Sequence, residues 1–544
     1  MAAVTAGHPA QLEGASGPRQ GGWARYAELC LPYVLALFFF ASALYRVNQT
    51  EIVDTDAARH AMNGAFIYDL LRTGHLLHPI AYAKVYYSHL PSLSVPFHPP
   101  VFPGIEAVFY AVFGVNLFTA RLAVALCVGI SAVLLYRLVL ATLGRSLLAA
   151  CVTMTTFSFW TFQWASRDVM LEFPALVFTL WALYCLRDFP DSYPLRRAIP
   201  FALFAAAAVW TKQHAVFLGA VPFIEAVLSR RWRRFLELPI WISSVLYGAA
   251  VIGLIGFSKL YHGAGVDQIS TSSRDVYYII NSTLPAYFYW ITTDLRGMPG
   301  VLLICAAAAY LWCLRRHDVE KPRLGLYLAW ILATFAVLVD LGPVSPRYLF
   351  FVLPATATVG YAWLFHGSRR LLGDRGAGIV AVVFAACFFV TGLNVPFDFL
   401  RGPGAAARVI VKGTSTRVLY AGDGDGNFIF AVRALDPKLQ VTVIPAAKLP
   451  RGLFEQTSLA GICRRYAIEW VVFENVPEQH PWSGFREGLP AVARLERSIP
   501  LESTRARWRQ GSVDVYRVAG AGQNPDDGIP LPVPRLQEEI PSKP

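Results

Sequence analysis

The sequence predicts a polytopic α-helical membrane protein that ends in a small external α/β domain. Of its 544 residues, 55% are hydrophobic and only 15% are charged, and the mean hydropathy is +0.44. Soluble globular domains carry roughly a quarter charged residues, so most of this chain must contact lipid. The same composition excludes a disordered chain, a collagen-like repeat and a small disulfide-rich scaffold.

Long apolar runs define a membrane region over residues 29–400. The first run, Leu29–Tyr45, is too long for the core of a signal peptide and lacks a small-residue cleavage site, which favours a retained transmembrane helix. With this run included, the pattern predicts about eleven transmembrane helices. The other runs lie at about 119–141, 147–163, 171–186, 198–210, 215–228, 238–257, 298–314, 324–341, 347–365 and 376–394.

The remaining segments differ from these runs in composition. Residues 1–28 are rich in Gly, Ala and polar residues and are expected to form a disordered cytoplasmic head. Residues 401–520 have the composition of a soluble domain, and the Pro-rich, acidic tail 521–544 is expected to be disordered. Within the membrane region, long loops at 49–100 and 258–297 are expected on the external side.

Arginine clusters fall in alternate connections between the apolar runs. This is the positive-inside pattern, which places the amino terminus and the Arg-rich loops in the cytoplasm. The net charge of +12 is therefore mainly a signal of topology, and no nucleic-acid partner is expected. The clusters are Arg145; Arg187, Arg196 and Arg197; Arg230, Arg231, Arg233 and Arg234; Arg315, Arg316, Lys321 and Arg323; and Arg369, Arg370 and Arg375.

The eight cysteines predict no internal disulfide. Seven lie in apolar runs, where a thiol behaves as a small hydrophobic group, and only Cys463 lies outside them. A single thiol outside the membrane has no partner with which to form an internal bridge.

Two short apolar runs, 198–210 and 215–228, lie between two cytoplasmic Arg clusters. Each is shorter than the roughly 20 residues that cross a bilayer, so together they predict a tight hairpin with Thr211–His214 at its tip. Lys212 at this tip is costly unless it faces protein or a water-filled cavity.

The loop 49–100 carries the most informative charges. Asp54, Asp56 and Arg59 follow the first helix directly, and the next residues show helical spacing. Asp56 can act as the N-cap of an amphipathic helix in the membrane interface. Alternatively, a carboxylate at the mouth of a helical bundle can serve as a general base. The loop closes with a histidine-rich stretch that includes His98.

A second group of charges lies where the third apolar run ends and the fourth begins. Arg167, Asp168 and Glu172 stand at this membrane boundary. Ionisable residues in such places are often functional, but an Arg–Asp pair that snorkels to the surface explains them equally well.

Alternating strands and helices predict the fold of the external domain. We expect strands at 417–421, 441–444 and 470–473, and helices at 428–435 and about 456–467. This alternation is typical of a small α/β domain.

The segment Gly422–Asn427 superficially resembles a phosphate-binding or calcium-binding loop. It lacks the full spacing of a dinucleotide fingerprint and of an EF-hand loop. A strand-to-helix turn capped by Asn427 is favoured, and no ligand is assigned to it.

The order of these motifs resembles the GT-C membrane glycosyltransferases over about residues 29–400. The similarity is to the branch that contains the aminoarabinose transferases, the Rgt-type transferases and the protein O-mannosyltransferases. The motifs are a D-x-x-R step after the first helix (Asp56–Arg59), a long loop that closes on His98–Pro99, a helix that ends in F-G-V-N (113–116), a carboxylate shortly before a proline (Glu172–Pro174), a W-T-K hairpin (Trp210–Lys212) and a P-R-Y-L helix start (Pro346–Leu349).

The resemblance implies transfer of a sugar from a polyprenyl-phosphate donor to an acceptor hydroxyl on the external face of the membrane, with inversion of the anomeric centre. It implies that Asp56 is the general base. Glu172 takes the place of a second catalytic carboxylate, which is usually aspartate in the family. Arg59, Lys212 and Arg347 fall at positions expected to bind the donor phosphate.

The resemblance does not decide whether a metal is bound, and it assigns no certain cofactor. Some relatives place a metal beside an acidic residue just before the His-Pro step, but this sequence has Phe97 there. His98, Asp54 and Asp168 are therefore candidates for contacts to substrate or to a divalent metal. Arg274, in the loop 258–297, is a further cation that could meet the charge of the donor phosphate.

The resemblance further implies a protein of the bacterial inner (plasma) membrane with its carboxy-terminal domain in the periplasm or outside the cell, acting on a lipid, glycan or protein acceptor. Two other classes stay open: a transporter or flippase of lipid-linked sugars, and a non-catalytic cell-envelope assembly protein. A transporter should show paired repeats with discontinuous helices, and no convincing repeat is seen. An assembly protein would leave Asp56, Glu172 and Lys212 without a role. An O-antigen ligase or polymerase is a further enzymatic alternative.

Overall fold

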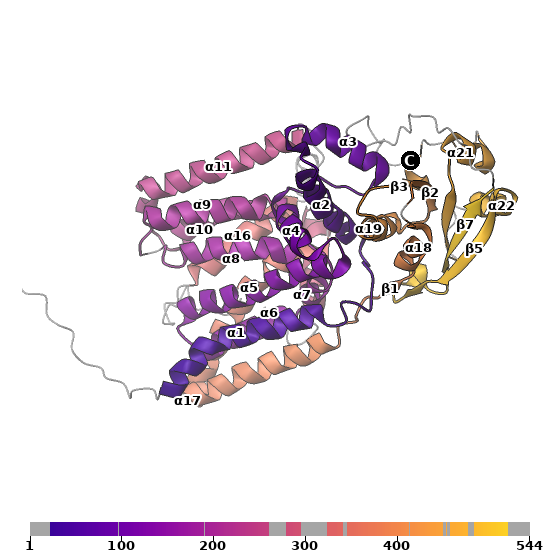
Figure 1. Cartoon of the computed structure of the whole chain (residues 1–544). Coiled ribbons are helices and arrows are strands. Elements are labelled where there is room, and N and C mark those ends of the chain that lie inside the picture. The colour runs from indigo at the N-terminus through magenta and orange to yellow at the C-terminus, as the bar shows by residue number, and fades with distance from the viewer. Residues whose placement is uncertain are drawn as a thin grey trace, which may run out of the picture.

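The computed structural model describes residues 22–519 apart from 260–278, 295–323, 341–344, 477–482 and shorter gaps at 96, 190, 413, 450–452 and 454–456. The described residues form a bundle of roughly parallel helices with an α/β domain at one end (Figure 1), which confirms the predicted fold class. The run 298–314, most of the loop 258–297 and the tail lie outside the described residues.

The bundle and the loop 49–100 contain helices of very different lengths. They are α1 (Gly22–Leu44), α2 (Thr55–Arg72), η1 (His75–Leu77), α3 (Pro79–His89), α4 (Val101–Phe113), α5 (Leu117–Leu143), α6 (Ser146–Ser158), α7 (Trp160–Ser166), α8 (Glu172–Leu186), α9 (Leu195–Val209), η2 (Gln213–Gly219), α10 (Val221–Leu228), η3 (Trp232–Leu236), α11 (Leu238–Lys259), η4 (Ile279–Thr283), α14 (Leu284–Asp294), α16 (Gly325–Asp340), η5 (Pro346–Phe351) and α17 (Leu353–Leu393). Because α1 begins at Gly22, residues 22–28 are helical and not part of a disordered head, which corrects that boundary.

Three of the described helices, α5, α11 and α17, are long and apolar enough to cross a membrane, and six shorter apolar helical segments accompany them. The predicted run 147–163 is divided into α6 and α7 because the backbone is extended at Phe159. The last two predicted runs are joined in α17, which is interrupted at Gly373. The φ of Gly373 is +71°, a conformation that glycine adopts without a side-chain clash.

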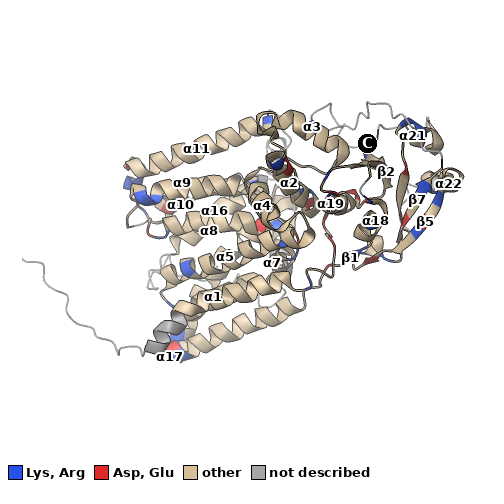
Figure 2. Cartoon of the chain, viewed as in Figure 1, with Lys and Arg blue, Asp and Glu red and all other residues tan. Residues whose placement is uncertain are grey.

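Basic residues gather at the end of the bundle opposite to the α/β domain (Figure 2). Arg145, between α5 and α6, lies 3.4 Å from Asp374 at the interruption of α17. Arg197, at the start of α9, pairs with Asp188 at 2.5 Å. The Arg clusters that the structure describes thus gather at one end of the helices, and the cluster at 315–323 lies outside the described residues.

The loop 49–100 is folded around α2, which packs against α4 and against α19 of the α/β domain. Of the two alternatives for Asp56, the N-cap role does not hold: Asp54 is the N-cap, and its carboxylate accepts the N–H of Asp56 at 2.9 Å. Most residues from Ala57 to Leu70 are buried, so α2 is an internal element and does not lie on a membrane surface. The Asp56 side chain is consequently not used for capping.

The α/β domain is built on a five-stranded sheet with the strand order β3-β2-β4-β7-β5. Strands β3, β2 and β4 are parallel, whereas β7 is antiparallel to both β4 and β5. The predicted strands and helices are present, and α18, α22, β5 and β7 are additional. The elements are β1 (Leu400–Arg401), α18 (Pro403–Ile410), β2 (Thr416–Ala421), α19 (Asp425–Leu435), β3 (Val441–Pro445), η6 (Ala446–Lys448), α21 (Leu459–Arg465), β4 (Trp470–Asn475), α22 (Ser483–Val492), β5 (Ala493–Pro500), β6 (Glu502–Ser503), η8 (Ala506–Trp508) and β7 (Ser512–Val518).

Both faces of this sheet are covered, as expected for parallel strands made of continuous apolar runs. Val418 and Val472 point to the face covered by α18 and α19, and this core is continuous with that of the bundle. Leu419 and Val471 point to the opposite face, covered by α21 and α22. One face of the domain is therefore part of the same hydrophobic core as the membrane helices.

The turn after β2 holds a carboxylate from the neighbouring strand. The N–H groups of Asp423 and Gly424 donate to Glu474 on β4, at 2.8 and 3.0 Å. The Tyr420 hydroxyl donates to the same carboxylate. Asn427 lies inside α19, whose N-cap is Gly424, so the prediction that Asn427 caps this helix is wrong. The turn that resembles a phosphate loop is thus occupied by the buried Glu474.

A buried ion pair joins α2 to the α/β domain. Arg433 on α19 donates from Nε and Nη2 to the two carboxylate oxygens of Asp69 on α2, at 2.7 and 2.6 Å. The Arg433 and Asp69 side chains are only 2% and 0% exposed. The Tyr86 hydroxyl also donates to Asp69, at 3.1 Å. This bidentate, charge-assisted geometry fixes the domain to α2.

Substitution of Arg433 tests this attachment. Arg433→Met keeps much of the side-chain length but leaves a buried carboxylate without its main cation, which costs about 3–5 kcal/mol. We therefore expect a clear fall in the midpoint of thermal unfolding in detergent micelles. Arg72→Ala is the control, because Arg72 is exposed and lies 3.4 Å from the same carboxylate, and it should change the midpoint little. Equal midpoints for wild type and Arg433→Met would contradict this role of the pair.

Candidate active site

The carboxylate of Asp56 lies at the end of the bundle that carries the α/β domain. It belongs to the first turn of α2, and its Oδ2 accepts a hydrogen bond from Nη1 of Arg347 at 2.8 Å. Arg59, one turn further along α2, lies 3.7 Å from Oδ1. The Asp56 side chain is 26% exposed, so the group is both neutralised by cations and accessible to a ligand.

Arg347 comes from η5, the short turn before α17. Pro346 occupies the start of this turn. Proline suits this position, because an N–H here would have no hydrogen-bond partner within the helix. The Tyr348 ring is buried and stacks on His214 with 4.6 Å between ring centres. The turn is thereby held against the hairpin, and the guanidinium of Arg347 reaches Asp56.

A second ion pair lies at the tip of the hairpin. Lys212 follows the end of α9, and its Nζ donates to Oε1 of Glu172 at 2.5 Å. Glu172 begins α8, where the helix dipole favours a negative charge. The Glu172 side chain is 1% exposed and that of Lys212 is 11% exposed. The ammonium of Lys212 and the carboxylate of Glu172 therefore neutralise each other, and a buried charge needs such a partner.

His98 connects the two ion pairs electrostatically. The charges of Asp56 and Lys212 both act on its imidazole, and its Nδ1 is 3.0 Å from the Ser94 hydroxyl. The neighbouring Phe97 carbonyl accepts a hydrogen bond from the side-chain amide of Gln213. The end of the loop 49–100 is therefore bound directly to the hairpin tip.

Burial and neighbouring charges set the protonation states in the loop. Burial alone raises the pKa of the Asp56 carboxyl, but the hydrogen bond from Arg347 and the surrounding cations outweigh it and hold this pKa below its usual value. Burial lowers the pKa of His98 well below its usual value, and the Asp56 charge opposes this only in part. At neutral pH the site therefore holds an ionised Asp56 beside a neutral His98.

Two further histidines, His60 and His214, belong to the site and were not predicted. His60 is buried and His214 is partly buried, and the Nδ1 atom of each lacks a hydrogen-bond partner within the described part of the chain. The His60 ring meets that of His98 edge-on, with 4.4 Å between ring centres. The spacing of Asp56 and His60, four residues apart on one helix, is the sequence signal that could have found it. These nitrogens are available for hydrogen bonds to a polar ligand.

Asp168 and Asp54 form a neighbouring cluster that anchors the start of α2. Oδ2 of Asp168 accepts the N–H groups of Val53 and Asp54, both at 3.1 Å. Oδ1 of Asp168 lies 3.5 Å from Arg121. Asp54 caps α2, and its Oδ2 lies 3.5 Å from Arg505 of the α/β domain.

The arrangement of His98, Asp54 and Asp168 does not fit a metal. Backbone N–H groups and guanidinium groups already surround the two carboxylates, and a hydroxyl occupies Nδ1 of His98. Among the residues that the structure describes, no group of three or more His, Cys, Asp or Glu could hold a metal ion.

The structure brings the predicted catalytic and phosphate-binding residues together, with Asp54 and Asp168 in the adjoining cluster. Arg274 lies outside the described residues. The residues that meet are Asp56, Glu172, Arg59, Lys212, Arg347 and His98.

Comparisons with known proteins address the fold. The family model for dolichyl-phosphate-mannose-protein mannosyltransferases matches residues 97–262, a range that contains His98, Glu172 and Lys212. No curated protein sequence matches the chain.

Solved structures of two proteins are similar to the chain. ArnT from Cupriavidus metallidurans in the apo state has a TM-score of 0.60 at 15% identity, over 92% of this chain and 100% of that one. The same protein bound to undecaprenyl phosphate has a TM-score of 0.57 at 14% identity, over 92% and 99%. The archaeal oligosaccharyltransferase AglB from Archaeoglobus fulgidus, in complex with an inhibitory peptide and a dolichol-phosphate, has a TM-score of 0.51 at 9% identity, over 91% and 76%. The family match and these structures together show that the chain has the fold of the GT-C superfamily, as its motifs predicted.

Proposed function

We propose that the chain is a membrane glycosyltransferase that moves a sugar from a polyprenyl-phosphate donor to an acceptor hydroxyl. The observation that carries this proposal is the meeting of the Asp56–Arg347 and Lys212–Glu172 pairs at one end of the bundle. The likeness in fold to ArnT bound to undecaprenyl phosphate, and to AglB in complex with a dolichol-phosphate, supports a lipid-phosphate donor.

Three cations are placed to bind the donor phosphate. The side chains of Arg347 and Arg59 are 31% and 46% exposed, and the charge of Lys212 acts on that of Arg347. A phosphate that enters here competes with Asp56 for Arg347. When the bond between the sugar and the phosphate breaks, the phosphate leaves as an anion whose charge is met by fixed cations.

Asp56 is the proposed general base. Its ionised carboxylate accepts the proton of the acceptor hydroxyl while the oxygen of that hydroxyl bonds to the anomeric carbon. Attack from the face opposite to the phosphate inverts this carbon. When the phosphate engages Arg347, the carboxylate loses part of its neutralising charge while its burial remains. Its basicity therefore rises once the donor is bound.

Glu172 is proposed to position Lys212 and, through it, the donor. The resemblance implies a catalytic role for this second carboxylate, but its Oε1 is occupied by the Lys212 ammonium. Its buried Oε2 lacks a hydrogen-bond partner within the described residues. A buried anion fixed at a helix start holds the flexible lysine side chain in one direction.

We place this site on the external face of the bacterial plasma membrane, with the amino terminus in the cytoplasm and the α/β domain in the periplasm or outside the cell. The support is the concentration of Lys and Arg at the opposite end of the bundle (Figure 2). The acceptor hydroxyl belongs in this proposal to a lipid, glycan or protein on that face.

Reporter fusions test the orientation. Alkaline phosphatase fused after Arg401 should be active, because it needs the oxidising external compartment. The same reporter inserted within Arg230–Arg234 should be inactive, and green fluorescent protein at that position should fluoresce. Reversed signals would place the site in the cytoplasm and contradict the proposed acceptor side.

Asp56→Asn keeps the size of the side chain and removes its basicity. We expect transfer of labelled sugar in proteoliposomes to fall by roughly 10²–10⁴. Thermal stability should stay close to wild type, because Asp54 and not Asp56 caps α2. Asp54→Asn is the matched control, since asparagine caps a helix as well as aspartate does. Wild-type transfer by Asp56→Asn would rule out the proposed base, and a loss in Asp54→Asn alone would assign the base to Asp54.

Arg347→Met should shift the pH dependence of transfer. Arg347 favours the charged form of Asp56, so its removal leaves burial to raise the pKa of this carboxyl. The base then becomes protonated at a higher pH, and the acid limb of kcat/KM against pH should move upward. Arg59→Met is the comparison, because its longer contact of 3.7 Å predicts a smaller shift. An acid limb that stays in place in Arg347→Met would contradict the coupling.

A further inference from the structure

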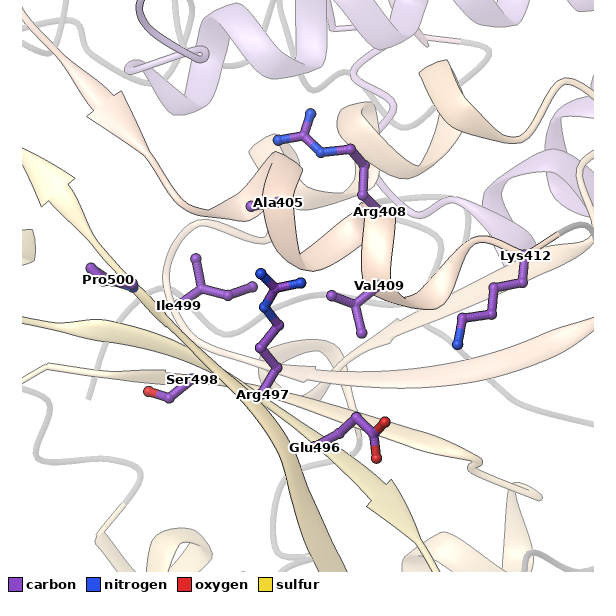
Figure 3. A pocket seen from close by; sticks show the side chains of 9 residues that line it. All are labelled: Ala405, Arg408, Val409, Lys412, Glu496, Arg497, Ser498, Ile499 and Pro500. Atoms are coloured by element: carbon purple, nitrogen blue, oxygen red, sulfur yellow. The ribbon is translucent and has the colours of Figure 1, made fainter.

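A groove between α18 and β5 of the α/β domain is lined by cations. Its volume is about 730 Å³. Arg408 and Lys412 line it from the side of α18, and Arg497 extends from β5 towards that helix (Figure 3). Within the described part of the chain, none of the three side chains forms an ion pair, although the charge of Glu51 acts on Arg408 at longer range. Glu496 is the carboxylate of the lining.

The helix side of the groove follows from the sequence of α18. Ala405, Arg408 and Val409 recur at the spacing of one helix face. Lys412 follows two residues after the helix ends, with its Nζ 5.9 Å from the centre of the Trp470 ring. Small and apolar residues thus alternate with cations along this side of the groove. Ile499 of β5 adds apolar surface from the opposite side. The result is an apolar strip flanked by positive charge.

Charged residues on an edge strand have a simpler explanation, because they prevent unwanted pairing with another sheet. This explains Glu496 and Arg497 on β5, which is the last strand of the sheet. It does not explain why Arg408 on a separate helix, and Lys412 just after that helix, line the same groove. Like charges that line one groove from two elements create a positive field that favours an anionic ligand.

The groove is connected to the loop that carries Asp56. The N–H groups of Gly402 and Gly404, at the start of α18, donate to the carboxylate of Glu51 at 3.3 and 2.8 Å. Glu51 lies in the segment between α1 and α2, just before the Asp54 cap. A ligand held along α18 therefore lies on an element fixed directly to the catalytic loop.

We infer that this groove binds an oligosaccharide that carries anionic groups, as part of the acceptor. The inference rests on the proposed function, which supplies a glycan acceptor. The volume falls in the range of ligand pockets, about 300–1,000 Å³. Arginine recognises carboxylates and phosphates through paired hydrogen bonds, and the apolar strip suits the C–H faces of sugar rings.

The position of the groove favours a glycan over a lipid headgroup. Strand β5 lies on the side of the sheet away from the helical bundle (Figure 1). Residues 401–520 contain 17 Lys and Arg against 11 Asp and Glu, so the field of the whole domain attracts an anionic chain.

The test is direct binding to the full-length protein in nanodiscs of phosphatidylcholine. Tetragalacturonate is the anionic probe, and maltotetraose is a neutral probe of the same length. We expect tetragalacturonate to bind more tightly than maltotetraose, and to weaken as salt rises from about 50 mM to about 300 mM. Arg408→Ala combined with Arg497→Ala should weaken binding about tenfold or more. Arg464→Ala, at an exposed position on α21 outside the groove, should leave binding unchanged.

Equal affinity for the two probes, or equal affinity in wild type and the double variant, would overturn the inference. Binding to phosphatidylglycerol vesicles that the double variant loses, without tetragalacturonate binding by wild type, would assign the groove to lipid headgroups and also overturn it. If the groove does not bind the anionic oligosaccharide, the wild-type protein should still transfer sugar. If the proposed function is wrong, the wild-type protein should bind tetragalacturonate but transfer no sugar. The two outcomes are therefore distinguishable.

Discussion

The position of the whole site depends on the buried guanidinium of Arg121. This side chain is 3% exposed and donates to three backbone carbonyls in the segment Val47–Glu51, each at 2.9 Å. Its charge is balanced by Asp168, which in turn accepts the N–H groups that directly precede α2. Backbone bonded to buried charges cannot move without breaking several charge-assisted hydrogen bonds. The chain is therefore fixed directly before the helical turn that presents Asp56.

Helix α2, which begins directly after this anchor, contacts the candidate site, α4 and the α/β domain. Its first turn presents Asp56 and His60 to the candidate site. Its middle packs so closely on α4 that a Cβ atom at Gly64 would lie 2.6 Å from the Cβ of Glu106, which requires glycine there. Its last turn carries Asp69, the partner of the α/β domain. Site geometry, helix packing and domain attachment are therefore properties of one helix.

Much of this fold was predictable because membrane helices need long apolar runs and buried parallel strands are continuous apolar runs. Strand β5 was not predictable because exposed charges remove its alternation. In β7 the alternation of apolar and polar residues stops at Val515, which leaves too short a signal to predict a strand. The N-cap of α2 could not be chosen from the sequence, because Asp54 and Asp56 are equally good caps and only the backbone decides between them. The motif order found Asp56 and its cations. It could not find His214, whose place in the site depends on how the hairpin meets η5.

The Asp69–Arg433 pair constrains how relatives of this chain can diverge. A buried charge tolerates the loss of its partner poorly, so a neutral substitution at either position is acceptable mainly when the other changes with it. Homologous sequences should therefore carry both charges or neither, although the two positions are 364 residues apart. A chimera that borrows its carboxy-terminal domain from a relative without the arginine would leave an orphan carboxylate on α2. The loop and the domain must consequently be inherited as one unit, and the domain is not an exchangeable module.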